Sequence, residues 1–337
     1  MSLSWKIDEC CAYHDRLLLR GWCAHSAPGA PIVGVAAVFP ASTAGQAPTV
    51  VPVGSFGRPS PDVAAAVDPA ATHARFDELL PAPPDALGHD FTLRFTLADG
   101  TVLTSSSALG NAIEGDPFFA SFGHFLEHLH RLPPGGTVLE IGSRARSAVT
   151  RRQHIPAHLD YLGLDILPGP NVDLVGDAHE LSALLGERRF VAAMSFSVFE
   201  HLAMPWKVVL ELNRVLAPGG LVFTQTHQTW PLHEEPWDFW RFSRHSWQTL
   251  FNPATGFEVV EAVSGDPAHI HACFTNPVTH GLAASRDAHL GSASIARKVS
   301  ATTLSWPVPV ATAARDMYPA GELSSSPLSA TVPFQRG

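Results

Sequence analysis

Short apolar runs separated by turn-forming residues characterise the first 108 residues, and this pattern is typical of β-strands. Residues 91–97 alternate between apolar and polar side chains, and the Ala-Asp-Gly sequence at 98–100 predicts a hairpin turn after them. Residues 17–22 and 32–39 form two further apolar runs. We therefore expect a small antiparallel β-sandwich over residues 1–108.

A strand–helix alternation replaces this pattern after residue 113. Asp116 followed by Pro117 predicts the start of a helix, because the carboxylate caps free N–H groups and proline fits the first turn. Residues 205–216 predict another helix, which the Pro-Gly-Gly sequence at 218–220 ends. Such alternation indicates an α/β fold with a doubly wound, parallel sheet and a ligand site at the carboxyl ends of its strands. The expected strands are residues 137–141, 161–166, 172–175, 190–196 and 221–226.

The chain is therefore expected to have three parts. Residues 1–108 would form an accessory β-sandwich, and residues 113–301 would form the α/β domain. Residues 302–337 are rich in serine, proline, alanine and threonine and show little periodicity, so we expect a poorly structured C-terminal tail.

Charge and composition narrow the function classes. Lysine and arginine number 22 against 31 aspartate and glutamate, and the resulting net charge of −9 disfavours non-specific binding of nucleic acid. The cysteines, Cys10, Cys11, Cys23 and Cys273, lack the paired spacing of a disulfide scaffold or a zinc ribbon and suit a reducing cytosol. No apolar run approaches the ~18 residues that span a bilayer, and the N-terminus lacks the pattern of a signal peptide. We expect a cytoplasmic protein without a transmembrane segment.

Acidic and glycine residues follow the expected strands at consistent positions. Glu140 and Gly142 end the first strand, and Asp165 ends the second. Asp177 follows the third strand, and residues 194–202 end the fourth strand with the sequence MSFSVFEHL. In this order the motifs resemble those of class I methyltransferases that depend on S-adenosylmethionine (SAM).

The resemblance covers about residues 115–300 and implies a Rossmann-like sheet of seven strands, one of them antiparallel. Residues 257–263 and 292–299 would supply the last two strands, and SAM would lie across the carboxyl ends of the first, second and fourth strands. Gly142 would let the backbone approach the methionine end of SAM, where a side chain would clash. Asp165 would accept hydrogen bonds from both ribose hydroxyls.

The resemblance also implies the remaining cofactor contacts. Asp177 and Ala178 would meet the adenine amino group, and residues 195–197 would line the pocket near the sulfonium. Glu140 would orient the loop or reach the amino group of SAM through water. The expected cofactor-binding residues are Glu140, Gly142, Ser143, Asp165, Ile166, Asp177, Ala178, Ser195, Phe196 and Ser197.

The loop after the first strand departs from the family pattern. The family usually has two or three glycines there, whereas this chain has only Gly142, followed closely by Arg144 and Arg146. The two arginines either contact an anionic group of the substrate or cofactor, or lie on a solvated face of the loop. The GxGxxG motif that a NAD-binding Rossmann domain would need does not follow this strand.

An aromatic and polar segment directly follows the fifth strand. Residues 224–247 hold Trp230, Trp237, Trp240 and Trp247, and their place in the chain predicts a lid or substrate wall over the methyl group. Aromatic faces beside polar side chains suit a sugar ring, and the alternative is a hydrophobic lid that packs on the sheet. The segment also resembles a subgroup of bacterial methyltransferases associated with surface-polysaccharide and lipopolysaccharide loci. The expected substrate-binding residues are Trp230, Glu234, Trp237, Asp238, Trp240 and Arg241.

Three histidines near the strand ends are candidates for a catalytic base, because transfer to a hydroxyl requires removal of its proton near neutral pH. His227 is the first candidate, since it ends the fifth strand, and His233 and His201 follow. His227, His233 and Glu234 also offer metal-ligand atoms, but they lack the helical i, i+4 spacing of a metalloprotease. We therefore expect no metal.

These features predict a SAM-dependent methyltransferase that methylates an oxygen of a sugar or cell-surface glycan precursor by in-line transfer. The alternatives are a methyltransferase of a small metabolite and a non-catalytic scaffold or regulator with the same fold. Residues 20–22 and 57–63 loosely resemble small β-sandwich modules of bacterial glycan-modifying enzymes. The N-terminal module would then bind the substrate chain or a partner, or it would act as a stabilising appendage or as the surface of a homodimer.

Overall fold

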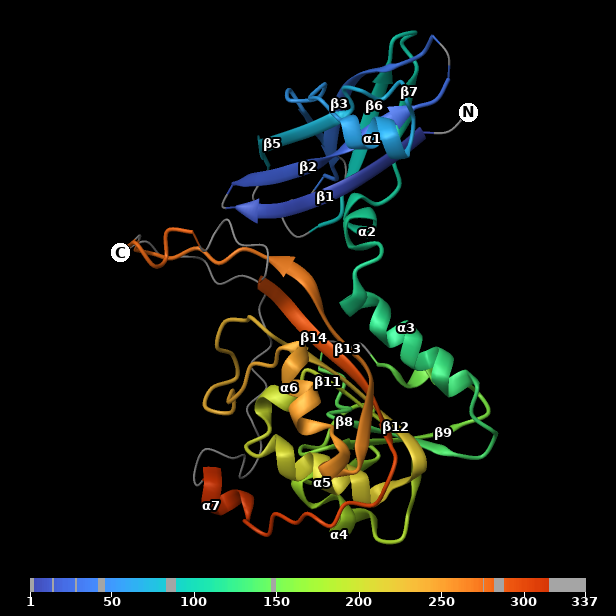
Figure 1. Cartoon of the computed structure of the whole chain (residues 1–337), viewed down its shortest axis with the longest axis vertical. Helices are drawn as coiled ribbons and strands as arrows, with labels where there is room; N and C mark the ends of the chain where they lie inside the picture. Colours follow the sequence, from blue (N-terminus) through green and yellow to red (C-terminus); the bar gives the residue numbers. More distant parts are fainter. Residues whose placement is uncertain are drawn as a thin grey trace. The chain divides into compact units, whose positions relative to one another are not determined.

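The computed structural model of the chain divides into two compact units, Met1–Gly115 and Asp116–Gly337 (Figure 1). The short helix α2 (Ala108–Ile113) belongs to the first unit, so the boundary falls a few residues after the expected one. Helix α2 is tied to strand β1 because the Ile7 N–H donates to Asn111 Oδ1 at 2.8 Å. The structure describes residues 3–13, 15–27, 29–41, 46–82, 89–146, 150–274, 276–281 and 288–314.

Two antiparallel sheets make up most of the described part of the first unit. A three-stranded sheet has the order β1-β2-β5, and a four-stranded sheet has the order β4-β3-β6-β7. The strands are β1 (Leu3–Tyr13), β2 (Arg16–His25), β3 (Ile32–Phe39), β4 (Thr49–Pro52), β5 (Arg75–Pro81), β6 (Thr92–Leu97) and β7 (Val102–Thr104), and helix α1 (Pro61–Ala66) lies between β4 and β5 in the chain.

One apolar core joins the two sheets of this unit. Alternate residues of β2, among them Leu17 and Leu19, are buried together with Val35, Phe39 and Phe95 of the other sheet. This alternation is the period-two pattern of strands that bury one face. The unit therefore has the antiparallel pairing and the common core that the expected β-sandwich requires.

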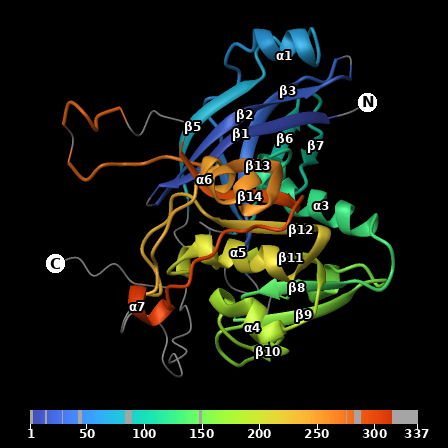
Figure 2. The same ribbon diagram turned by 60° about the horizontal axis from the view of Figure 1, so that its bottom comes forward.

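Among the residues that the structure describes, the second unit forms one sheet of seven strands in the order β10-β9-β8-β11-β12-β14-β13. In Figure 2 the strand labels run in this order from bottom to top. Strand β14 is antiparallel to β12 and β13, and the other neighbouring pairs are parallel, as expected. The strands are β8 (Thr137–Ile141), β9 (Asp160–Asp165), β10 (Leu174–Val175), β11 (Phe190–Phe196), β12 (Leu216–His227), β13 (Phe257–Ala268) and β14 (Ala288–Lys298).

Each face of this sheet has its own apolar cluster. Val138 packs in the cluster that contains Phe125 of helix α3, whereas the next residue, Leu139, packs in the cluster that contains Trp247 of α6. Because both faces are covered, the central strands are continuous apolar runs. The helices are α3 (Pro117–His130), α4 (Leu181–Leu185), α5 (Pro205–Val215), α6 (Arg244–Leu250) and α7 (Val310–Ala314). No helix within the described ranges is long and apolar enough to cross a membrane.

Helix boundaries follow the sequence signals closely. Helix α3 begins after Asp116, whose carboxylate accepts hydrogen bonds from the N–H groups of Phe118 at 2.9 Å and Phe119 at 3.4 Å. Helix α5 ends at Val215, but β12 starts at the next residue, so residues 217–220 belong to the strand rather than to a separate turn.

The structure describes the first part of the expected tail. Residues 302–309 lead to α7, where Val310 and Ala314 are buried against Met204 near the start of α5. This part therefore packs on the second unit, whereas residues 315–337 lie outside the described residues.

Candidate functional site

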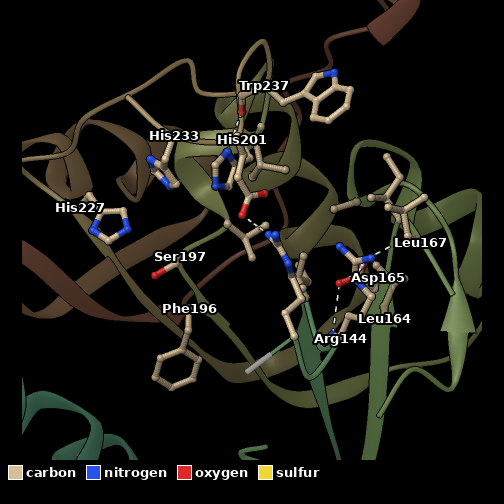
Figure 3. A pocket seen from close by; sticks show the side chains of 18 of the residues that line it. Arg144, Leu164, Asp165, Leu167, Phe196, Ser197, His201, His227, His233 and Trp237 are labelled. Carbon is tan, nitrogen blue, oxygen red and sulfur yellow. Dashed lines mark hydrogen bonds and ion pairs between the residues drawn. The ribbon is translucent and has the colours of Figure 1, made fainter. Parts of the chain in front are cut away.

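A cavity of about 500 Å³ lies at the carboxyl ends of β8, β9, β11 and β12 (Figure 3). The chain runs from β8 to β9 on one side and places β11 on the other, and ligands of such sheets bind at this switch in strand order. The location therefore agrees with the site that the fold predicts. The expected site residues that line the cavity are Gly142, Asp165, Ile166, Ala178, Phe196, Ser197, His201, His227, Trp230, His233, Glu234 and Trp237.

The backbone at Gly142 has a conformation that favours glycine. Its φ is +78°, and a Cβ atom added there would lie 2.1 Å from Cγ2 of Val198. The N–H groups of Gly142 and Ser143 both donate to the carbonyl oxygen of Leu164, at 2.8 and 3.1 Å. These hydrogen bonds fix the loop after β8 to the end of β9. The close approach of Val198 therefore requires glycine at position 142, independently of any contact with a cofactor.

We expect Gly142→Ala to lower the free energy of unfolding by about 2–4 kcal/mol, since positive φ costs ~1–2 kcal/mol and overpacking adds ~1–3 kcal/mol. Gly219→Ala is the matched control, because Gly219 has a φ of +77° but no atom within 4 Å of an added Cβ. Urea denaturation of both variants checks this expectation. Equal losses in the two variants would contradict a collision with Val198.

Asp165 ends β9 and presents a carboxylate to the cavity, with only 9% of the residue exposed. Its Oδ1 accepts a hydrogen bond from Leu167 N at 3.0 Å, and its Oδ2 accepts one from Arg144 N at 3.2 Å. Each carboxylate oxygen has a second lone pair, so both can also accept from the hydroxyls of a diol. Nε of Arg144 lies 3.9 Å from Oδ1, which places this guanidinium in the cavity wall.

Glu140 is connected to the loop after β8 by a chain of hydrogen bonds. Its buried carboxyl accepts a hydrogen bond from the Tyr161 hydroxyl at 2.5 Å, and burial raises the pKa of Glu140. The Tyr161 oxygen accepts a hydrogen bond from Asn171 Nδ2 at 2.9 Å, and the same amide nitrogen donates to the carbonyl oxygen of Ser143, also at 2.9 Å. Ser143 is buried, with 3% exposed, and is not among the residues that line the cavity.

Asp177 and Ser195 are not among the residues that line the cavity. The Asp177 carboxylate accepts a hydrogen bond from His179 N at 2.9 Å and contacts its Nδ1 at 2.7 Å, so that it caps the short helical turn that follows. Gly176 and Ala178, the neighbours of Asp177 in the chain, both line the cavity. Ser195 is buried within β11, with 2% exposed, and the two residues after it line the cavity. A contact between Asp177 and the adenine amino group stays a prediction.

A buried glutamate stands behind the expected catalytic histidines. Glu200 is fully buried; its Oε2 accepts a hydrogen bond from the Thr226 hydroxyl, and its Oε1 lies 3.3 Å from Nε2 of His227 and 3.9 Å from Nε2 of His201. Burial raises the pKa of Glu200 to about 7 and lowers the pKa of His227 to about 4. The 3.3 Å contact lacks hydrogen-bond geometry, so Oε1 has no hydrogen-bond partner among the described residues.

Fixed acceptors orient two of the histidines. Nδ1 of His201 lies 2.6 Å from the carbonyl oxygen of Trp237, and Nδ1 of His233 lies 3.1 Å from Oδ2 of Asp238. Asp238 is held in turn by Arg241, whose two terminal nitrogens contact the two carboxylate oxygens at 2.5 and 2.7 Å. Figure 3 shows the imidazoles of His201, His227 and His233 on one side of the cavity and Asp165 on the other.

The aromatic segment after β12 divides into cavity-lining and supporting residues. Trp230 lines the cavity and stacks on the imidazole of His227, with 4.6 Å between ring centroids. Arg241 donates to the carbonyl oxygens of Trp230 at 3.1 Å and Pro231 at 3.0 Å, and Trp240 Nε1 donates to that of Leu202 at 2.9 Å. Asp238, Trp240 and Arg241, which were expected to bind substrate, are not among the residues that line this cavity. They form contacts within the domain, and their contact with a substrate stays a prediction.

Several lining residues lie outside the set of site residues expected from the sequence, and Arg144 and Arg146, which the sequence left between a ligand contact and a solvated face, are among them. The guanidinium carbon of Arg151 lies 3.6 Å from the centroid of the Phe196 ring, and Arg146 forms an ion pair with Glu234 that joins the loops after β8 and β12. No strand-end signal marks Arg151, which follows the loop after β8. The other lining residues outside the expected set are Ile141, Arg144, Leu164, Leu167, Gly176, Val198 and Leu202.

Comparison with known proteins finds a sequence similarity within the second unit. Residues 118–262 match a family model described as a methyltransferase domain. The match begins in α3 and ends in β13, and it includes the strands that form the cavity. No curated protein matches the chain.

Solved structures of methyltransferases are similar to this chain at low sequence identity. A SAM-dependent methyltransferase from Archaeoglobus fulgidus is 14% identical over 53% of this chain and 92% of its own, with a TM-score of 0.39. A putative SAM-dependent methyltransferase from Listeria monocytogenes is 15% identical over 54% and 98%, with a TM-score of 0.34. The CurJ carbon methyltransferase is 16% identical over 52% of each chain, so only about half of its length is matched, with a TM-score of 0.36.

Proposed function

We propose that this protein, whose residues 118–262 match a methyltransferase-domain model, is a SAM-dependent enzyme that methylates a hydroxyl oxygen of a sugar or cell-surface glycan precursor. The observation that carries the proposal is one cavity with a carboxylate, Asp165, on one side and three histidines on the other. SAM supplies an electrophilic methyl group when it is bound. The acceptor must then present its oxygen from the histidine side.

The size of the cavity and the polar groups that line it both support binding of SAM. Its volume of about 500 Å³ lies within the range of about 300–1,000 Å³ that is usual for small-molecule sites. We assign the ribose hydroxyls to the carboxylate of Asp165, the methionine end to the loop at Gly142, and the adenine to the wall that includes Ile166 and Ala178. Phe196 ends β11 and Ser197 follows it, and both residues line the cavity.

His227 is the residue that we assign as the general base. It ends β12, lines the cavity and stacks on the Trp230 ring, and its Nε2 lies 3.3 Å from the Glu200 carboxylate. In the transfer, the acceptor hydroxyl gives its proton to the imidazole and its oxygen bonds to the methyl carbon. The carbon–sulfur bond breaks, and its electron pair stays on sulfur. Orientation of the reactants and exclusion of water account for most of the acceleration in such a displacement.

The acceptor side of the cavity favours a polar cyclic molecule. Trp230, with 42% exposed, and Trp237 offer aromatic faces, and Glu234 and the histidines offer hydrogen-bonding groups beside them. Aromatic faces beside polar groups recognise sugar rings through apolar contact on one side and hydroxyl contacts at the edge. We also propose that the first unit is an accessory module that binds the glycan chain or a partner.

Transfer of a labelled methyl group tests the proposal. The protein is incubated with methyl-labelled SAM and a set of cell-envelope glycan precursors, and mass spectrometry identifies the labelled product and the methylated atom. We expect label on a sugar hydroxyl. Label on a small metabolite, on nitrogen or on carbon would overturn the acceptor assignment, and SAM binding without transfer to any acceptor would favour a non-catalytic scaffold.

A further inference from the structure

We propose that Glu200, His201 and His233 bind a divalent transition-metal cation at the acceptor side of the cavity. This inference deepens the proposed function and rests on it for the role of the cation, but the binding site itself stands on geometry. One ligand atom from each of the three residues lies within 4.8 Å of the other two. Atoms that share a cation at ~2.1 Å lie about 3–4 Å apart, so small rotations of these side chains would complete the site.

The strongest support is the oxygen atom of Glu200 that faces the histidines. Glu200 is fully buried, and its Oε1 has no hydrogen-bond partner among the described residues, while its Oε2 accepts from the Thr226 hydroxyl. A buried carboxylate oxygen without a partner is costly, and such groups are normally paired with a cation or coordinate a metal. A cation at Oε1 would satisfy this atom.

The hydrogen bonds behind the histidines suit a metal site. His201 donates from Nδ1 to the carbonyl oxygen of Trp237 at 2.6 Å, which leaves Nε2 with its lone pair 3.9 Å from Oε1 of Glu200. His233 has Nδ1 3.1 Å from the carboxylate of Asp238, so its Nε2 is likewise available. Metal-binding histidines usually have such a carbonyl or carboxylate behind the ligating ring, which fixes the tautomer and the ring orientation.

The donor set determines the class of cation. Two imidazoles and one carboxylate suit zinc and neighbouring first-row divalent ions such as cobalt, iron and manganese, whereas calcium and magnesium prefer sites made of oxygen atoms. Three protein ligands leave at least one coordination position open. His201 and His233 line the cavity, so that position would face the acceptor.

A cation in this place would prepare the acceptor oxygen for transfer. Coordination lowers the pKa of a bound hydroxyl group and fixes its oxygen in position. His227, whose Nε2 lies 3.3 Å from Oε1 of Glu200, is close enough to take the released proton. The oxygen then bonds to the methyl carbon as the carbon–sulfur bond breaks, and the cation neither gains nor loses an electron.

Titration with Co²⁺ tests the site without any acceptor or SAM. The protein is first freed of metal with a chelator, and Co²⁺ is then followed by its visible absorption, with Zn²⁺ added as a competitor. We expect one Co²⁺ per chain, displaced by Zn²⁺. Glu200→Gln and His233→Gln should each weaken Co²⁺ binding by more than about tenfold, since loss of even a supporting residue usually costs 10–100-fold. His245→Gln is the matched control, because His245 is exposed and lies outside the cavity lining.

Two results would overturn the metal site. One is the lack of saturable Co²⁺ binding in the wild-type chain, and the other is equal affinity in the wild type and both site variants. Circular dichroism and SAM binding of each variant show whether it is folded. His233→Gln replaces a partly exposed side chain, so this variant should fold even if Glu200→Gln does not. Full methyl transfer in the presence of chelator, together with no Co²⁺ binding, would refute the cation and leave the proposed methyltransferase function intact.

Discussion

Replacement of Asp165 with alanine is expected to weaken binding of SAM by at least about 100-fold. A hydrogen bond to a charged group contributes ~1.5–3 kcal/mol, and the assignment gives this carboxylate two ribose hydroxyls. The variant also loses the acceptor of the N–H groups of Arg144 and Leu167, so the loop after β8 should become less ordered. Isothermal titration calorimetry of the variant and the wild type measures the change in affinity for SAM and for its demethylated product.

Two further variants separate ribose recognition from loop support. Asp165→Asn keeps the side-chain size and one acceptor oxygen, and we expect an intermediate loss of affinity. Asp160 lies at the opposite, exposed end of β9, so the Asp160→Ala variant should bind SAM as the wild type does. If Asp165→Ala binds SAM with unchanged affinity, the ribose assignment is wrong.

Replacement of His227 with alanine should reduce kcat by about 10²–10⁴-fold, the usual contribution of a positioned general base. Binding of SAM should be unchanged, because His227 lies on the histidine side of the cavity, away from Asp165 (Figure 3). Steady-state kinetics with the acceptor found by methyl labelling, together with SAM titration, provide the measurement.

A structural role for His227 would give a different result. Loss of the stacking partner of Trp230 alone would raise KM for the acceptor more than it lowers kcat. His245→Ala serves as the control for removal of a histidine outside the cavity. A kcat within twofold of the wild type, with normal SAM binding, would contradict the assignment of His227 as the base.

The central strands were the most predictable part of the fold. Strands β8 and β11 begin and end at the expected residues, 137–141 and 190–196, because strands covered on both faces require unbroken apolar runs. The edge strands β1 and β5 of the first unit were not expected. Their sequences, LSWKIDECCAY and RFDELLP, mix charged and apolar residues, since only part of each edge strand is buried.

The residues at strand ends were predictable for a similar reason. Gly142, Asp165, Phe196 and His227 meet in one cavity because parallel strands deliver their carboxyl ends to the same edge of the sheet. The direction of a side chain in a segment without regular structure has no such rule. The sequence therefore did not show that Trp240 holds the segment after β12 to the rest of the domain instead of facing the cavity.

The proposed metal site shows what spacing along the chain cannot reveal. In the sequence, His227, His233 and Glu234 offer ligand atoms without metal-binding spacing, and this pattern predicts no metal. The structure instead groups His233 with Glu200 and His201, which follow a different strand. Only the pairing of β11 with β12 brings these segments together. Sites of this kind become visible when ligand atoms and the orphaned oxygen of Glu200 are located in space.

A crystal structure with the demethylated product of SAM bound is the most direct test of the cofactor cradle at the strand ends. We predict both ribose hydroxyls within about 2.7–3.2 Å of the Asp165 carboxylate, the amino acid end beside Gly142, and the sulfur atom facing the histidine side of the cavity. A nucleoside bound elsewhere on the chain, or bound here with its ribose turned away from Asp165, would contradict the proposed site.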